Sequence, residues 1–345
     1  MTTGSTRRTP RAMLWTTIAA LLATGVMYFA FRHLDLGRLY DILLEAEPIW
    51  LLALAVSIPV EQVLRGWKWR QILFDIRSVG TFRLFKAVMV GYFANMMIPI
   101  GLSPLVRAWL IARLEALKIS TVLLTTAIER FVDGIVFAVL VGVLVIFAAL
   151  PESEGNLRLA LMVAGSSSLV LFTGLIGGLF LVKNHLVDSN SMVGRMVSWL
   201  ENAFGGRLAG IGLGMVEGIT WPKSRWRGCG VILASIVMKL ISTSHFLWVG
   251  LVFGILLSPF DYLFIMVVTG FALIVSRFIR VPGGGIMGSA FALKLLGIAD
   301  EEALTMVLVV HTSVMALIAG IGAIAMWNSG LTVLELRRAT RESLN

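Results

Sequence analysis

The sequence contains little cysteine, histidine and charge, and each shortage excludes a class of protein. Cys229 is the single cysteine among 345 residues, which excludes an intrachain disulfide and a metal cluster held by cysteines. The four histidines are scattered without ligand spacing, so we expect no metal site and no cofactor. Charged residues make up 14% of the chain, against about 25% in an average soluble domain. The chain is therefore not a soluble globular protein.

Apolar residues are correspondingly abundant, at 58% of the chain, and they are grouped into long runs. A helix needs about 20 apolar residues to cross the hydrocarbon layer. The run at 12–31 is too long for a signal peptide and is expected to stay as a first span. We therefore predict an all-α polytopic membrane protein with six full spans, at 12–31, 49–64, 119–150, 159–182, 229–257 and 303–327.

Two further apolar segments, 85–114 and 262–298, are interrupted by proline and glycine. Each has the pattern of a helix, a break and a second helix, which predicts a re-entrant helical hairpin. Backbone groups freed by such a break are tolerated at membrane depth only inside protein or beside a water-filled cavity. These breaks are therefore candidate substrate positions.

The basic residues predict the topology. With six spans and two re-entrant hairpins both termini are cytoplasmic, and 21 of the 29 Lys and Arg fall on that side. The net charge of +9 thus reflects short clusters between spans rather than a nucleic-acid surface. We expect a single integral membrane domain over 1–345, with no soluble domain.

Two stretches rich in Trp and basic residues are predicted at the cytoplasmic interface. The segment 184–228 keeps apolar residues at near-helical spacing, which indicates an amphipathic helix on the membrane or a plain connecting loop. Trp221 and Trp226 would be its interfacial anchors. The stretch "RGWKWR" at 65–70 is interpreted in the same way, as an anchor at the inner end of the second span.

The chain shows an internal repeat at an offset of 183 residues, which sets "IPIG" at 98–101 over "VPGG" at 281–284. The long helices that follow also align without a gap. By the predicted topology, repeat one (about 49–150) and repeat two (about 229–327) are antiparallel. Inverted repeats with Gly/Pro-broken segments at matching positions are typical of transporters.

Three charges interrupt the run "TTAIERFVDGIVFAVLVG" near its predicted mid-depth: Glu129, Arg130 and Asp133. Glu129 and Asp133 share a helix face, and Arg130 has the spacing to pair with Asp133. Charges at this depth usually face a bundle interior and mark a pathway. The alternative is an intramembrane charge network that only locks the helix in place.

Further polar residues at membrane depth favour an anionic ligand. The helix that begins after Gly285 would add its N-terminal dipole to nearby cations. The alternatives are pairing of Lys239 with a carboxylate, snorkelling of Arg277 and Arg280, and a positive-inside role for Arg107. The predicted substrate-binding residues are Asn95, Arg107, Lys239, Arg277, Arg280, Gly283 and Gly284. No catalytic constellation is present, so we expect no enzyme activity.

Four stretches together resemble a known family: "RGWKWRQIL", "GYFANMMIPIG" followed by "VRAWLIAR", "AIERFVDGI" and "VPGGGIMGSAFALKLLGI". Over about residues 10–330 the chain is similar to the lysylphosphatidylglycerol synthase transmembrane-region family, also described as flippase-like membrane proteins. The resemblance implies inverted repeats, re-entrant helices and movement of a lipid between leaflets. The soluble aminoacyl-transferase domain of the full-length synthases is expected to be absent.

The chain departs from the family pattern at three points. Leu102-Ser103-Pro104 follow the first break, where the family usually has an acidic residue. Ser289 stands where the family often has a glutamate, and His311 lies roughly where an arginine is common. The second half is thus poor in acid, so the substrate is expected to differ from a cationic aminoacylated lipid. We predict a flippase-like transporter of an anionic lipid, of the phospholipid or polyprenyl-phosphate class, in the bacterial inner membrane.

The alternative function is that of a non-catalytic accessory subunit for an enzyme of lipid or cell-envelope glycan synthesis. The expected partners are therefore a membrane lipid and, under the alternative, such an enzyme. A homo-oligomer is compatible with both. The sequence does not identify the lipid, the direction of transport or its energy source.

Overall fold

The computed structural model describes residues 47–97, 103–148, 156–187, 217–279 and 283–329, and every regular element in these ranges is helical. Six helices are long and apolar enough to cross a membrane, which confirms a polytopic all-helical membrane protein. These six are α3 (Pro48–Leu73), α6 (Ile119–Phe147), α7 (Leu157–Val187), α10 (Arg225–Val252), α11 (Pro259–Ile279) and α13 (Asp300–Asn328). The shorter helices are α4 (Thr81–Met97), α5 (Ser103–Glu115) and α12 (Gly284–Leu295).

These six candidate spans differ from the six that the sequence predicts. The predicted span 12–31 lies outside the described residues, as does 188–216 of the predicted amphipathic segment. The helix α11, which the sequence predicts as one short arm of a hairpin, is long enough to cross on its own. The helix α3 continues to Leu73, nine residues past the predicted end at 64, because its charged residues are paired inside the protein rather than placed at its end.

The chain divides into two compact units. The first unit takes the described residues of Met1–Leu51 and Phe246–His311, and the second takes those of Leu52–His245 and Thr312–Asn345. The helices α3, α10 and α13 each contribute to both units.

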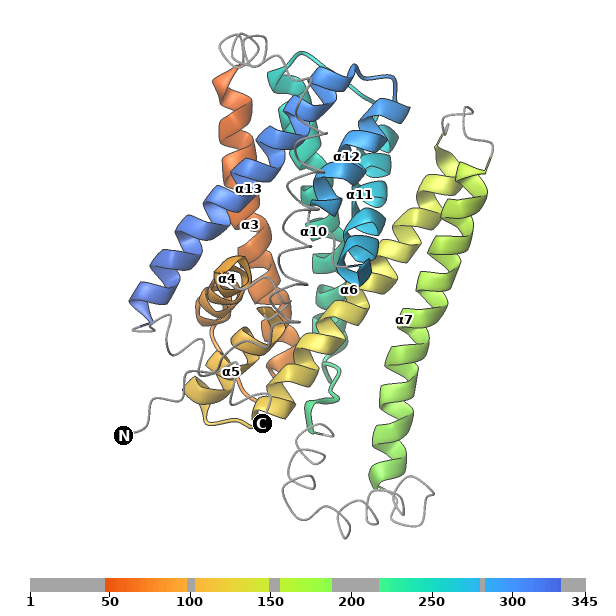
Figure 1. Ribbon diagram of the computed structural model, residues 1–345. Helices are drawn as coiled ribbons and strands as arrows, with labels where there is room; N and C mark the ends of the chain where they lie inside the picture. The colour runs from red at the N-terminus through yellow and green to blue at the C-terminus, as the bar shows by residue number, and fades with distance from the viewer. Residues whose placement is uncertain (1–46, 98–102, 149–155, 188–216, 280–282, 330–345) are drawn as a thin grey trace, which may run out of the picture. The chain divides into compact units, whose positions relative to one another are not determined.

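In the second unit, α4 and α5 pack closely against each other, and α6 and α7 lie side by side (Figure 1). A Cβ added at Gly91 of α4 would lie 2.8 Å from the carbonyl oxygen of Ser103, at the start of α5. A Cβ at Gly66 of α3 would lie 2.9 Å from the backbone nitrogen of Phe85. Small residues let membrane helices approach this closely, because no larger side chain fits between the backbones.

The core of this unit combines apolar residues of α3, α4, α5 and α6. Trp69, Val88, Ile111 and Val122 are among its fully buried members. Polar side chains also reach this core, since Trp69 contacts the Arg107 guanidinium and donates a hydrogen bond to Thr125, so its helices are joined by polar as well as apolar contacts.

In the first unit, α11 and α12 form an antiparallel pair (Figure 1). Gly283 precedes α12 with a left-handed φ of 85°, a conformation that glycine adopts without strain. A Cβ at Gly284 would lie 2.2 Å from the Ser276 side chain. The hydroxyls of Thr269 and Ser289 are 2.8 Å apart and join the two helices further along. The glycines after this break thus permit close helix packing.

Candidate functional site: a buried charge cluster

Two carboxylates of α6 lie inside the second unit. Glu129 and Asp133 are four residues apart, so they share one face of a 29-residue helix. Glu129 is 0% exposed and Asp133 is 8% exposed. Burying a carboxylate away from water costs several kcal/mol unless a cation compensates it. The partners of these two groups therefore decide what the site is.

The helix α3 supplies two of these partners. Arg65 and Lys68 follow Glu61 by four and seven residues, so the three side chains leave α3 on the same face. The Nζ atom of Lys68 lies 2.5 Å from Asp133 Oδ1 and 3.6 Å from Glu129 Oε1. The Nη1 atom of Arg65 lies 3.5 Å from Asp133 Oδ2 and 3.9 Å from Glu129 Oε1. Both α3 cations thus face both α6 carboxylates.

The helix α5 adds a third cation, Arg107, which is 0% exposed. Its Nη2 atom lies 2.9 Å from Glu129 Oε2, an ion pair without the alignment of a hydrogen bond. Its guanidinium lies 5.0 Å from the ring centre of Trp69, whose Nε1 donates a hydrogen bond to Thr125 Oγ1. The guanidinium makes no hydrogen bond to any part of the chain that the structure describes. Buried donors without acceptors are costly, so Arg107 is available to an additional acceptor.

The helix α10 approaches the same group with polar side chains. Ser235 Oγ accepts a hydrogen bond of 3.3 Å from Lys68, and Ser242 Oγ donates one of 3.2 Å to Glu61. Lys239 lies on the same face of α10, between the two serines, and its Nζ is 5.4 Å from the centre of the Phe137 ring. Polar groups of α10 thus contact the charged side chains of α3 that face the α6 carboxylates.

Arg130 does not form the predicted ion pair with Asp133. Its Nη2 atom instead donates a 3.4 Å hydrogen bond to the hydroxyl of Tyr92 on α4. Asp133 is already taken by Lys68 and Arg65 from another helix. Spacing within α6 allows the local pair, but tertiary packing supplies closer partners.

These side chains form one group, called here the charge cluster. It contains five cations and three carboxylates, so it carries two more positive than negative charges when all its groups are ionised. Arg130 and Lys239 are the two cations with no carboxylate within ion-pairing distance among the described residues. No set of three metal-binding side chains occurs in the described ranges. The arrangement can therefore attract an anion. Its members are the cations Arg65, Lys68, Arg107, Arg130 and Lys239 and the carboxylates Glu61, Glu129 and Asp133.

The other predicted site residues are not members of the charge cluster. Asn95 lies on α4 one turn after Gly91, and its buried Oδ1 accepts no hydrogen bond from the described residues. Gly283 and Gly284 belong to the first unit, where they begin α12. Arg277 belongs to the last turns of α11, and Arg280 lies outside the described residues. The structure thus brings together Arg107, Lys239, Glu129, Arg130 and Asp133 of the predicted set.

Sequence reasoning missed Glu61, Arg65, Lys68 and Tyr92 as members or neighbours of the cluster. The interpretation of the "RGWKWR" stretch as an interfacial anchor is wrong for its centre, since Lys68 and Trp69 are both 0% exposed. The spacing of Glu61, Arg65 and Lys68 on one face of an otherwise apolar helix is the signal that could have found them. In the segment 184–228, Trp226 is 88% exposed, as an interfacial anchor would be. Trp221 instead packs against Ile72, Val132 and Val231.

Comparison with known proteins identifies the family. The family model described as the lysylphosphatidylglycerol synthase TM region matches residues 16–322, most of the chain. The chain belongs to this family. Searches of curated proteins and of solved structures gave no match. The family is implicated in lipid modification and flippase-like membrane function, and the match specifies no substrate. The charge cluster lies within the matched residues.

Proposed function

We propose that this protein is a flippase-like transporter that moves an anionic lipid between the leaflets of the bacterial inner membrane. The lipid is of the phospholipid or polyprenyl-phosphate class. Family membership and six candidate spans support a role in the membrane. The observation that carries the proposal is the surplus of two cations in the charge cluster, because a bound anion would compensate them in a medium of low dielectric.

We further propose an inverted repeat with two re-entrant hairpins as the transport scaffold. The helix bounds support the repeat, since α5 and α6 shifted by 183 residues would run from 286 to 298 and from 302 to 330. The helices α12 (284–295) and α13 (300–328) nearly coincide with these ranges.

In this mechanism the carboxylates keep the cations in place when no lipid is bound. Glu129 and Asp133 hold Lys68, Arg65 and Arg107 by ion pairs. A lipid phosphate would compete with them for the same cations, so the cluster would have two arrangements, one closed and one occupied by lipid. No nucleophile or metal is needed, and we propose that the chain is not an enzyme.

The test is leaflet exchange in proteoliposomes that contain the purified full chain and fluorescent phosphatidylglycerol. We expect exchange faster than in protein-free vesicles, and a several-fold loss in the Asp133→Asn variant. Asp300→Asn is the matched control, because Asp300 forms an exposed ion pair with Lys294. The proposal fails if neither phosphatidylglycerol nor a polyprenyl phosphate exchanges faster than in empty vesicles.

A second function, that of an accessory subunit, is favoured by one observation. Glu129 and Asp133 are each within ion-pairing distance of two or more cations, as in a structural lock. This function predicts a partner enzyme that co-purifies in mild detergent. It also predicts that Asp133→Asn lowers stability without changing leaflet exchange.

A further inference from the structure

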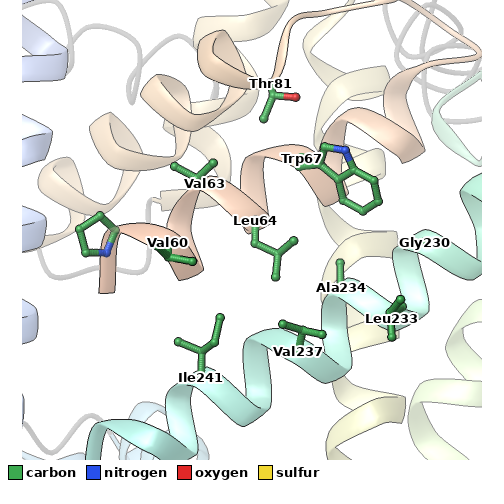
Figure 2. A pocket seen from close by; sticks show the side chains of 11 residues that line it. Val60, Val63, Leu64, Trp67, Thr81, Gly230, Leu233, Ala234, Val237 and Ile241 are labelled. Carbon is green, nitrogen blue, oxygen red and sulfur yellow. The ribbon is translucent and has the colours of Figure 1, made fainter. Parts of the chain in front are cut away.

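A groove lies between α3 and α10 on the side away from the charge cluster. Figure 2 shows apolar side chains of both helices that face this space. Its volume is about 650 Å³, and Thr81, at the start of α4, is its single hydroxyl-bearing lining residue. The other lining residues are Pro59, Val60, Val63, Leu64 and Trp67 from α3 and Gly230, Leu233, Ala234, Val237 and Ile241 from α10.

The rim of the groove is exposed and its floor is buried. Val60, Val63 and Leu233 are 48%, 41% and 61% exposed, whereas Ala234 is 3% exposed. Both helices are candidate membrane spans. On membrane-spanning helices we expect exposed apolar rims to face hydrocarbon rather than water, which would bring lipid to this groove.

The groove is separate from the charge cluster. Lys68 of α3 and Ser235 of α10 are hydrogen-bonded to each other, and neither of them lines the groove. This polar contact therefore joins α3 and α10 through residues outside the groove lining.

One end of the groove is basic. Arg70 lies one turn after Trp67 on α3, and Arg227 lies one turn before Gly230 on α10. Both guanidinium groups lie near the ring of Phe74, at 5.9 Å and 3.3 Å from its centre. The Nε atom of Arg70 is buried without a hydrogen-bond partner among the described residues.

The only carboxylate that pairs with either arginine among the described residues is that of Asp75. It lies 3.8 Å from Arg227 and also accepts a hydrogen bond from the backbone of Lys223. Two arginines and one carboxylate, which pairs with Arg227 alone, leave positive charge at the end of an apolar groove. The combination matches an amphiphile with a hydrocarbon chain and an anionic head.

We propose that the groove binds one acyl chain of an anionic glycerophospholipid whose phosphate is held by Arg70 and Arg227. Guanidinium groups bind phosphate oxygens through paired, charge-assisted hydrogen bonds. The acyl chain fills the space between α3 and α10 and completes their packing. This lipid is a bound component of the protein and requires no transport. The site can therefore be tested independently of the proposed function.

The apolar segment 12–31 is the rival occupant within this chain. It contains no acidic residue, so it cannot compensate Arg70 and Arg227. A phospholipid supplies both the chain and the negative charge. The charge at the end of the groove therefore favours the lipid.

The experiment uses the full chain in vesicles with a photoreactive phosphatidylglycerol that carries its reactive group on one acyl chain. We expect labelled peptides from α3 and α10 in the wild type. Val237→Trp fills the groove and should reduce this labelling by roughly tenfold, if the lost chain contacts are worth about 1.4 kcal/mol. Val170→Trp on α7, an exposed apolar position, is the matched control and should leave the α3 and α10 labelling unchanged.

The headgroup is tested with Arg227→Gln and with photoreactive phosphatidylcholine. Arg227→Gln should abolish the preference for phosphatidylglycerol over phosphatidylcholine, while Arg225→Gln, an exposed position on the same helix, should retain it. Equal labelling of wild type and Val237→Trp would overturn the proposal. Capture of residues 12–31 by a photo-crosslinker at position 233 would also overturn it. Either result leaves the leaflet-exchange assay unaffected.

Discussion

At the scale of single residues, the most informative side chain is Lys68. It is 0% exposed and lies between the carboxylates of Asp133 and Glu129. We expect Lys68→Met to destabilise the protein by about 3–5 kcal/mol, because removal of one partner leaves buried charge uncompensated. Thermal unfolding in detergent measures the effect.

The matched control is Lys294→Met, at an exposed ion pair with Asp300. An exposed pair contributes about 0–1 kcal/mol, so this change should have little effect. The double variant Lys68→Met with Asp133→Leu should recover part of the lost stability, since an apolar pair often replaces a buried ion pair at little cost. A double variant less stable than Lys68→Met alone would contradict this interpretation of the pair.

Residue patterns along the chain predict the α6 carboxylates of the charge cluster better than its α3 cations. Glu129 and Asp133 stand out because they interrupt a long apolar run. Lys68 does not, because it lies among tryptophans and arginines that are typical of an interface. The pairing of Arg130 with Tyr92 rather than Asp133 depends on α4 and α3, which helix periodicity within α6 cannot describe.

At the scale of helices, close packing of α4 on α5 depends on Gly91. A Cβ there would lie 2.8 Å from a carbonyl oxygen, an atom of the backbone that cannot move aside cheaply. Gly91→Ala should therefore lower the stability of the protein by about 1–3 kcal/mol, as expected for overpacking. Thermal unfolding in detergent, compared with the wild type, measures this loss.

Gly142 on α6 provides the control, because a Cβ added there would have nothing within 4 Å. Alanine has the higher helix propensity, so Gly142→Ala should leave stability unchanged or raise it by about 1 kcal/mol. Equal losses in both variants would show that the contact with Ser103 does not decide the effect at Gly91.

The helices could be predicted mostly from apolar run length and from Pro/Gly breaks. As the sequence indicates, α4 ends at Met97 before α5 begins at Ser103, and α11 ends at Ile279 before α12 begins at Gly284. The end of α3 could not be predicted in this way. A charged stretch ends a span when it reaches water, but here Arg65 and Lys68 are compensated by α6 and the helix continues.

At the scale of the whole molecule, the distribution of basic residues predicts that both termini face the cytoplasm. Cys229 is the single cysteine, so Cys229→Ser gives a background for single-cysteine variants. In intact spheroplasts an impermeant maleimide should label Glu154→Cys and should not label Thr3→Cys or Ser343→Cys. Permeabilised membranes should allow labelling of all three. Labelling of only one terminus in intact spheroplasts would require an odd number of crossings.

The surplus charge of the cluster has an electrical consequence. A charge that crosses the whole bilayer exchanges about 2.3 kcal/mol with each 100 mV of membrane potential. Arg130 and Lys239, the cations without a carboxylate partner among the described residues, belong to helices α6 and α10, which are candidate spans. An anion that reaches them from either surface crosses part of that voltage. Its affinity should therefore depend on the membrane potential, and an energised cell and a depolarised vesicle would load the site differently.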